Sequence, residues 1–87
     1  MLLARIEGSL TSTRKHPSYL GWRLLICQPV DGAGVPNGAP RAAIDPCGAA
    51  LHQTVIVSSD GAAARLAVKD PLSPVRDMIV AIMDETR

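Results

Sequence analysis

The stretch from residue 44 to residue 65 places the strongest constraint on how this chain folds. It contains Thr54–Val57, four consecutive β-branched residues, and such a run predicts a short buried strand. Asp45-Pro46 ahead of the run favours an extended or turn conformation, and Gly48 permits a positive φ. We therefore expect a strand that is entered through a tight turn.

Small residues follow this strand. Ser58, Ser59 and Asp60 are residue types that cap helix N-termini, and this role explains them without a catalytic triad. Gly61–Arg65 is a glycine and three alanines before an arginine, and its small side chains let another backbone approach closely. The arginine either reaches across such an interface to a carboxylate or a carbonyl, or lies solvated in a loop. We expect the segment to be a contact surface.

The length and composition indicate one compact β domain spanning residues 1–87. A chain of 87 residues buries only roughly 60–65% of its unfolded surface, so a monomer of this size is marginally stable. Hydrophobic residues make up 47% of the chain, with seven Gly, seven Pro and no Phe, which is typical of tight turns joining strands of small apolar side chains. More apolar surface than one small core can hold favours an obligate oligomer.

The charge balance and the cysteines exclude several classes of protein. A formal net charge of +1 gives no long-range field for nucleic acid or an anionic membrane. Cys27 and Cys47 do not make a disulfide framework, and we expect two thiols in a reducing cytosol. Arg5 and Glu7 interrupt the N-terminal apolar residues too early for a secretory signal, and no apolar stretch has the length of a membrane span. We expect a cytoplasmic protein.

Alternation and turn signals predict three further strands. Every second residue of 2–10 is apolar or glycine, which indicates a half-buried strand. Trp22–Gln28 predicts a second strand, because apolar residues dominate it and a proline ends it. Two turn dipeptides within Asp31–Pro40 place a hairpin tip ahead of a third short strand at Arg41–Ile44.

The segment before the C-terminus fits two structures. The apolar residues of Val75–Ile82 have helical spacing, while Ile79–Met83 also fits a buried strand. Leu66–Val68, ahead of a proline-bearing loop, is expected to be a short extended piece. With the strand alternative the chain has five short strands separated by turn signals, which favours a small barrel.

Two cysteines and two histidines are the possible ligands of a metal ion: Cys27, Cys47, His16 and His52. None of them has a paired spacing such as C-x-x-C or H-x-x-x-H, so we predict no metal and no cofactor. Cys47 and His52 are near in sequence, but a nucleophile pair also needs a third group that orients the base, and none is evident. We expect His16 in a solvated loop and His52 in a turn, where His tolerates a positive φ.

Motifs for phosphate and for single-stranded nucleic acid are weak. Gly48-Ala49-Ala50 and Gly61-Ala62-Ala63 match neither G-x-x-x-x-G-K-[ST] nor G-x-G-x-x-G. Small barrels bind single strands with stacked aromatics above a basic groove. The available residues are Tyr19, Trp22, Arg14, Lys15 and Arg23. We expect Trp22 in the core or at a subunit contact. A small barrel that binds nucleic acid or another ligand stays the alternative function, and a Cys/His metalloenzyme is a third.

Taken together, several segments resemble the bacterial microcompartment vertex family, which is named for EutN and CcmL. Asp45–Gln53, the strand after it and Gly61–Arg65 are similar to the family's signature, D-x-V-G-A-G-x-G-E, a strand, then G-S-S-A-R. Three further matches are Gly8–Lys15 with G-x-V-x-S-T-x-K, Leu20–Pro29 with L-x-G-x-K-L-L-x-x-Q, and Pro74–Asp84 with P-x-D-x-x-V-V-A-I-V-D. The resemblance runs in order along nearly the whole chain.

The resemblance implies a mainly β fold, a small five-stranded OB-like β-barrel with short helical turns, and a strand rather than a helix at Ile79–Met83. It implies a homopentamer without catalytic residues or cofactors that caps the five-fold vertices of a microcompartment shell in the cytoplasm. The implied partners are hexameric shell proteins, not nucleic acid or a membrane. The candidate subunit interface or pore comprises Gly61, Ala62, Ala63, Ala64 and Arg65.

The chain departs from the family's signature at several positions. Ala50 and His52 stand where the signature has glycines, Gln53 where it has Glu, and Arg76 where it has Asp. Gly61–Arg65 also lacks the two serines of G-S-S-A-R. The hydrophobic pattern is unchanged by these departures, so the expected fold is the same.

Overall fold

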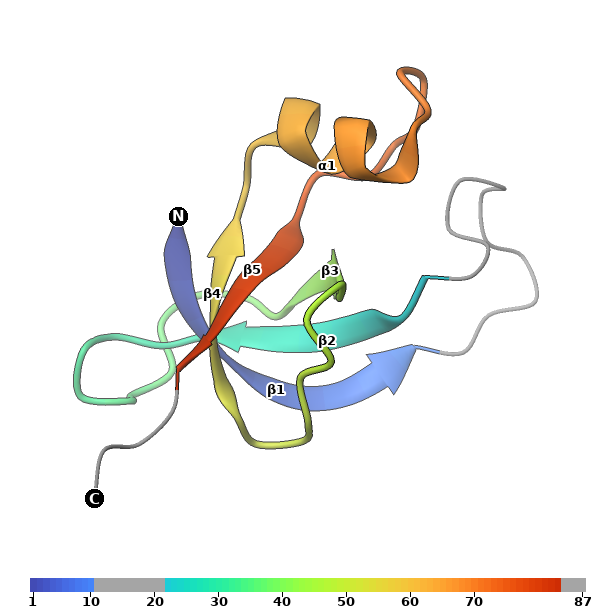
Figure 1. The fold of residues 1–87 in the computed structure, drawn as a ribbon. Helices are drawn as coiled ribbons and strands as arrows, with labels where there is room; N and C mark the ends of the chain where they lie inside the picture. The colour runs from blue at the N-terminus through green and yellow to red at the C-terminus, as the bar shows by residue number, and fades with distance from the viewer. Residues whose placement is uncertain (11–21, 84–87) are drawn as a thin grey trace.

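The computed structural model describes residues 1–10 and 22–83, which fold into a closed β-barrel with a helix at one end (Figure 1). The elements are β1 (Leu2–Leu10), β2 (Leu24–Pro29), β3 (Arg41–Ile44), β4 (Thr54–Ser58), α1 (Gly61–Val68) and β5 (Met78–Met83). Around the barrel the strands follow the order β1-β2-β3-β5-β4. The predicted five-stranded barrel is confirmed.

β1 is long enough to pair with two neighbours. Leu2–Arg5 runs antiparallel to β4, and Ala4–Leu10 runs antiparallel to β2 with a register shift between Ile6 and Gly8. The side chains of Ala4 and Ile6 are buried, as the alternation of residue types predicts. One continuous strand therefore joins two sides of the barrel.

β2 and β3 form the predicted hairpin, in which Leu24–Cys27 pairs antiparallel with Arg41–Ile44. Asp31 shapes the loop between them, because its Oδ1 accepts the N–H groups of Ala33 at 2.9 Å and Val35 at 3.0 Å. This local bond from the side chain to the backbone is the reason that Asp is common in turns.

Gly61–Val68 is a helix, so the extended conformation predicted for Leu66–Val68 is wrong. Asp60 caps the N-terminus, and Lys69 ends the helix in the left-handed conformation with φ 59°. Alanine, leucine and arginine are good helix formers, and the last residues of α1 pack against buried side chains of the barrel. Capping and the burial of one helix face thus outweigh the strand preference of the β-branched Val68. No helix in the described part of the chain is long and apolar enough to cross a membrane.

β5 confirms the strand alternative for the final segment. It runs antiparallel to β4 along Met78–Met83, and Ile79 is fully buried. Residues 74–77 ahead of it form no regular element. A helix here would leave the backbone N–H and C=O groups on this side of β4 without hydrogen-bond partners. The strand is favoured because it forms these bonds.

Two clusters of buried side chains make the core. The main cluster fills the barrel with small and branched residues: Ala4, Ile6, Leu25, Cys27, Ala43, Ala49, Val55, Val57 and Ile79. The second cluster lies between the barrel and α1 and contains Leu24, Ile44, Ala64 and Val75. The position of α1 therefore depends on the second cluster rather than on the barrel interior.

Candidate functional site

The segment Gly61–Arg65 forms the first turns of α1, at one end of the barrel (Figure 1). The Asp60 carboxylate accepts the Ala62 N–H at 3.0 Å, and the Asp60 N–H donates to Ser58 Oγ at 3.3 Å. The capping role predicted for these residues is confirmed for Asp60. The cap fixes where the helix begins and hence which residues of the segment face outward.

The small residues of the segment divide between two faces. Ala64 is fully buried and packs in the second cluster with Leu24, Ile44 and Val75. Ala62 is exposed, while Gly61, Ala63 and Arg65 are partly buried. Ala64 thus allows α1 to lie close to its own barrel, while Ala62, Ala63 and Arg65 keep at least part of their surface exposed.

Arg65 folds back over the start of its own helix. A Cβ atom at Gly61 would lie only 2.8 Å from Arg65 Nη1, so the glycine leaves the space that the guanidinium uses. Within the described residues the Arg65 side chain has neither a hydrogen bond nor an ion pair. Its donors are therefore available to a group outside this part of the chain.

A shallow apolar pocket of about 260 Å³ adjoins this face. It is lined by Ala62, Arg65, Leu66, Lys69, Asp70 and Pro71. Two leucines of the same region are strongly exposed, Leu66 at 80% and Leu72 at 87%. Leu66 also lines the pocket, so apolar surface at this position faces solvent.

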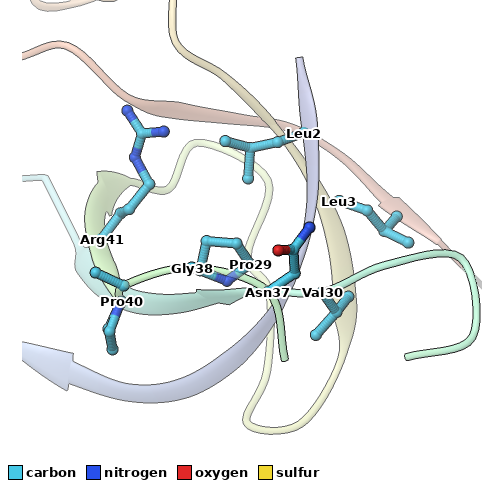
Figure 2. Close-up of a pocket in the computed structure, with 9 residues that line it drawn as sticks. Leu2, Leu3, Pro29, Val30, Asn37, Gly38, Pro40 and Arg41 are labelled. Carbon is cyan, nitrogen blue, oxygen red and sulfur yellow. The ribbon is translucent and has the colours of Figure 1, made fainter. Parts of the chain in front are cut away.

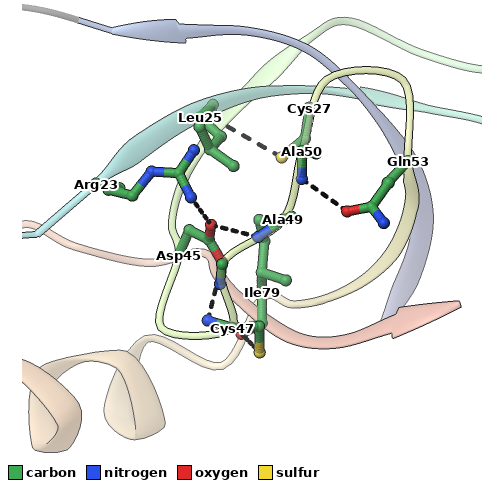
Figure 3. A network of polar contacts seen from close by, with 10 residues as sticks. Arg23, Leu25, Cys27, Asp45, Cys47, Ala49, Ala50, Gln53 and Ile79 are labelled. Atoms are coloured by element: carbon green, nitrogen blue, oxygen red, sulfur yellow. Dashed lines mark hydrogen bonds and ion pairs between the residues drawn. The ribbon is translucent and has the colours of Figure 1, made fainter.

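The loop between β3 and β4 is held by one buried carboxylate (Figure 3). Oδ1 of Asp45 accepts the N–H groups of Cys47 and Gly48, and Oδ2 accepts the Ala49 N–H at 2.8 Å. Arg23 Nη1 also donates to Oδ2, at 3.0 Å. A carboxylate with four donors fixes the loop at its start, because each donor loses a charge-assisted bond if the loop moves.

The end of the same loop is held by Gln53. Its Oε1 accepts the Ala50 N–H at 2.7 Å, and its backbone carbonyl accepts the Ile6 N–H at 3.0 Å. His52 has φ 68°, as its predicted turn position requires, and its N–H donates to the Ile6 carbonyl. Two departures from the family's signature are thus accommodated, because His adopts the positive φ and the Gln oxygen supplies an acceptor.

The described candidates for a metal or a nucleophile do not converge. The Cys27 thiol points to the Leu25 carbonyl at 3.8 Å, and the Cys47 thiol to the Ile79 carbonyl at 3.5 Å rather than to His52. Residues 1–10 and 22–83 contain no group of three His, Cys, Asp or Glu that could hold a metal. His16, the fourth candidate, lies outside the described residues.

The described candidates for nucleic-acid binding, Trp22 and Arg23, already have partners within the protein. Trp22 lies just ahead of β2, is partly buried and packs against the second cluster. Arg23 is paired with Asp45, so its charge is partly neutralised. Tyr19, Arg14 and Lys15 lie outside the described residues.

A larger pocket of about 440 Å³ lies between the start of β1 and the β2–β3 loop (Figure 2). It is lined by Leu2, Leu3, Pro29, Val30, Asn37, Gly38, Ala39, Pro40 and Arg41. No predicted site residue lines it. The guanidinium of Arg41 is engaged by Asp77, so this pocket lacks a free charge with which to bind a polar ligand.

Comparison with known proteins gives one family. The sequence model of the family described as ethanolamine utilisation protein EutN/carboxysome matches residues 1–84. The carboxysome shell vertex protein CcmL of Gloeobacter violaceus is 34% identical over 84 residues, which cover 97% of this chain and 83% of that protein. The microcompartment shell vertex protein EutN of Salmonella typhimurium is 35% identical over 85 residues, covering 98% and 85%.

A solved structure from a similar protein has the same fold. The pentameric microcompartment shell protein GrpN of Rhodospirillum rubrum superimposes with a TM-score of 0.83 at 28% identity. The alignment covers 100% of this chain and 98% of GrpN. The whole barrel with its helix, rather than one part of it, is therefore shared with that protein.

The Asp45 network predicts a specific loss of stability. Asp45→Asn should lower the free energy of unfolding by roughly 1–3 kcal/mol, because an amide offers one acceptor oxygen where the carboxylate uses two. Asp31→Asn is the matched control, since its exposed Oδ1 alone accepts both N–H groups of its loop, and should cost less than roughly 0.5 kcal/mol. Urea unfolding at equal protomer concentration measures both. Equal losses in the two variants would contradict the role given to Asp45.

The two thiols should differ in reactivity. Burial, together with the negative charges of Asp77 and Asp45, raises the pKa of the Cys27 thiol to about 11. Cys27 therefore stays protonated and unreactive near pH 8, roughly the ordinary range for alkylation, whereas Cys47 is exposed. An alkylating reagent should label Cys47 alone in the native protein and both thiols in urea. Native Cys47→Ser should remain unlabelled, and rapid labelling of that variant would refute the prediction.

Proposed function

Because the chain belongs to the EutN/CcmL family, we propose that it forms a homopentamer that caps the vertices of a bacterial microcompartment shell. The observation that carries this proposal is the match over almost the full length to proteins named as shell vertex proteins. The role places the protein in a shell within the bacterial cytoplasm. It is a structural role, and the proposal assigns no catalytic group and no cofactor.

A ring of identical subunits suits both the shell and the protomer. A cyclic ring with heterologous contacts supplies a five-fold point in a shell of hexagonal tiles. The protomer is small, and it exposes Leu66, Leu72 and Leu51 to water. Burying such side chains against a neighbour stabilises a small domain. Assembly and folding therefore support one another.

The subunit contact is proposed to include Gly61, Ala62, Ala63, Ala64 and Arg65. Ala64 acts from within by holding α1 against the barrel, while Ala62, Ala63 and Arg65 form the outward face. The Arg65 guanidinium, which has no partner among the described residues, donates to a carboxylate or a backbone carbonyl of the adjacent subunit. Small side chains beside it let the two backbones approach.

The further partners are hexameric shell proteins of the same microcompartment, with no role for nucleic acid. Within residues 1–10 and 22–83, no observation favours the alternative of a nucleic-acid-binding barrel. Trp22 is packed against the second cluster, and Arg23 is paired with Asp45. A single-strand site needs both exposed aromatics and free cations.

Co-assembly tests the proposed role. The hexameric shell proteins should form closed polyhedral shells when this chain is expressed with them, and open sheets or tubes when it is omitted. Electron microscopy and the composition of purified shells give the result. Shells that close equally well without this chain, or that do not retain it, would overturn the proposal.

Ala62→Glu should weaken the ring. A glutamate in the first turn of a helix is favourable for the helix itself, so the loss should come from a charge placed in the subunit contact. Native mass spectrometry should show smaller species for this variant. Ala33→Glu, at the exposed β2–β3 loop, is the control and should keep the wild-type mass. An intact ring for Ala62→Glu would remove this residue from the contact.

A further inference from the structure

The boundary between β3 and β5, called here the β3–β5 seam, lacks a continuous ladder of backbone hydrogen bonds. The β1–β2, β1–β4, β2–β3 and β4–β5 pairs each run over at least four residues of both strands. β3 and β5 are parallel and meet in register only at Ile44 and Met78. A strand pair with so short a ladder is the place where a barrel opens with the least loss of backbone hydrogen bonds.

Side chains close this seam instead. Arg41 Nε donates to Asp77 Oδ2 and Arg41 Nη2 to Asp77 Oδ1, both at 3.0 Å, which is the two-pronged geometry of a strong arginine–carboxylate pair. The Ile44 N–H donates to the Asp77 carbonyl at 3.1 Å. Arg41 begins β3 and Asp77 precedes β5, so one acidic residue ties both ends of β3 to the segment before β5.

The burial of the pair is uneven, and this makes it costly to break. The Asp77 side chain is 9% exposed and that of Arg41 is 38% exposed. If Arg41 is removed, the Asp77 carboxylate remains almost buried without its charged partner. A buried charge that loses its partner is destabilising, and opening the seam to water is the direct way to relieve it.

The second cluster lies under the seam. Ile44 from β3 and Val75 from the segment before β5 pack there with Ala64 of α1. Opening the seam would therefore separate side chains that hold α1 in place, while β1 and β4 keep their own ladder.

We infer that the Arg41–Asp77 pair is a latch that holds the β3–β5 seam closed and thereby fixes the position of α1. The seam is the first part of the barrel to open, and the latch sets how often it does so. This inference concerns contacts inside one protomer, so it does not require that the protomer form a ring. It also gives the buried pair a role distinct from general stability.

Amide hydrogen exchange of Arg41→Gln tests the latch. The Ile44 amide and the amides of α1 should exchange about tenfold faster than in the wild type, because the seam opens more often. Amides in the β1–β4 ladder should change by less than about twofold. Arg5→Gln is the matched control: it removes an exposed arginine from an ion pair with Glu7 and should leave Ile44 unchanged.

Two further variants keep the test decisive. Arg41→Lys retains the positive charge but lacks the two-pronged geometry, so its Ile44 amide should exchange faster than in the wild type and more slowly than in Arg41→Gln. If Arg41→Gln does not fold, the comparison of Arg41→Lys with the wild type still tests the latch. Asp77→Asn with Arg41→Gln should perturb Ile44 less than the sum of the single changes, because neither charge is then left alone. Equal acceleration in every strand, an unchanged Ile44 amide, or strict additivity would overturn the inference. The solution mass of each variant is recorded separately, so loss of the ring is not confused with opening of the seam.

Discussion

Two buried carboxylates hold β3, the strand whose ladder to β5 is the shortest in the barrel. Asp77 binds Arg41 at the start of β3, and Asp45, directly after β3, binds Arg23. β3 is four residues long and has a full ladder on one side only. Backbone bonds alone hold such a strand weakly on its open side. Each carboxylate is nearly buried, so losing its arginine would cost more than an exposed pair of the same charges.

These ion pairs connect the barrel to α1, which carries the proposed subunit contact. The seam that Arg41 and Asp77 close covers the second cluster, and that cluster carries Ala64 of α1. The same helix presents Ala62, Ala63 and Arg65 outward. The interior thus fixes the orientation of the proposed contact face. A shell vertex needs such a rigid face, because five copies must meet at one angle for a ring to close.

Local patterns in the sequence predicted most of the fold. The β-branched run at Thr54–Val57, the alternation in β1 and the turn residues of the β2–β3 loop act through neighbours in the chain, so they can be recognised without a structure. The choice of a strand for β5 needed the family resemblance, because its apolar spacing fits a helix as well. Leu66–Val68 was mispredicted because the cap at Asp60 and the packing of α1 on the barrel outweigh local strand preference.

The candidate site was only partly predictable, for the same reason. The capping of α1 is local and was foreseen, but the burial of Ala64 depends on Val75 and on two strands. The pairs Arg23–Asp45 and Arg41–Asp77 join residues 22 and 36 positions apart, and no spacing rule predicts such contacts. The run of small residues at Gly61–Ala64 indicated a contact surface from the sequence alone, whereas no local pattern indicated the residues that orient α1.

The mass of the purified protein in solution tests the central claim most directly. Native mass spectrometry over a range of protomer concentrations should give one main species of five times the 9.2 kDa protomer mass. This result would establish the ring that the vertex role requires. A folded monomer that persists at every concentration would contradict the account, because a single barrel has no five-fold axis to place at a vertex.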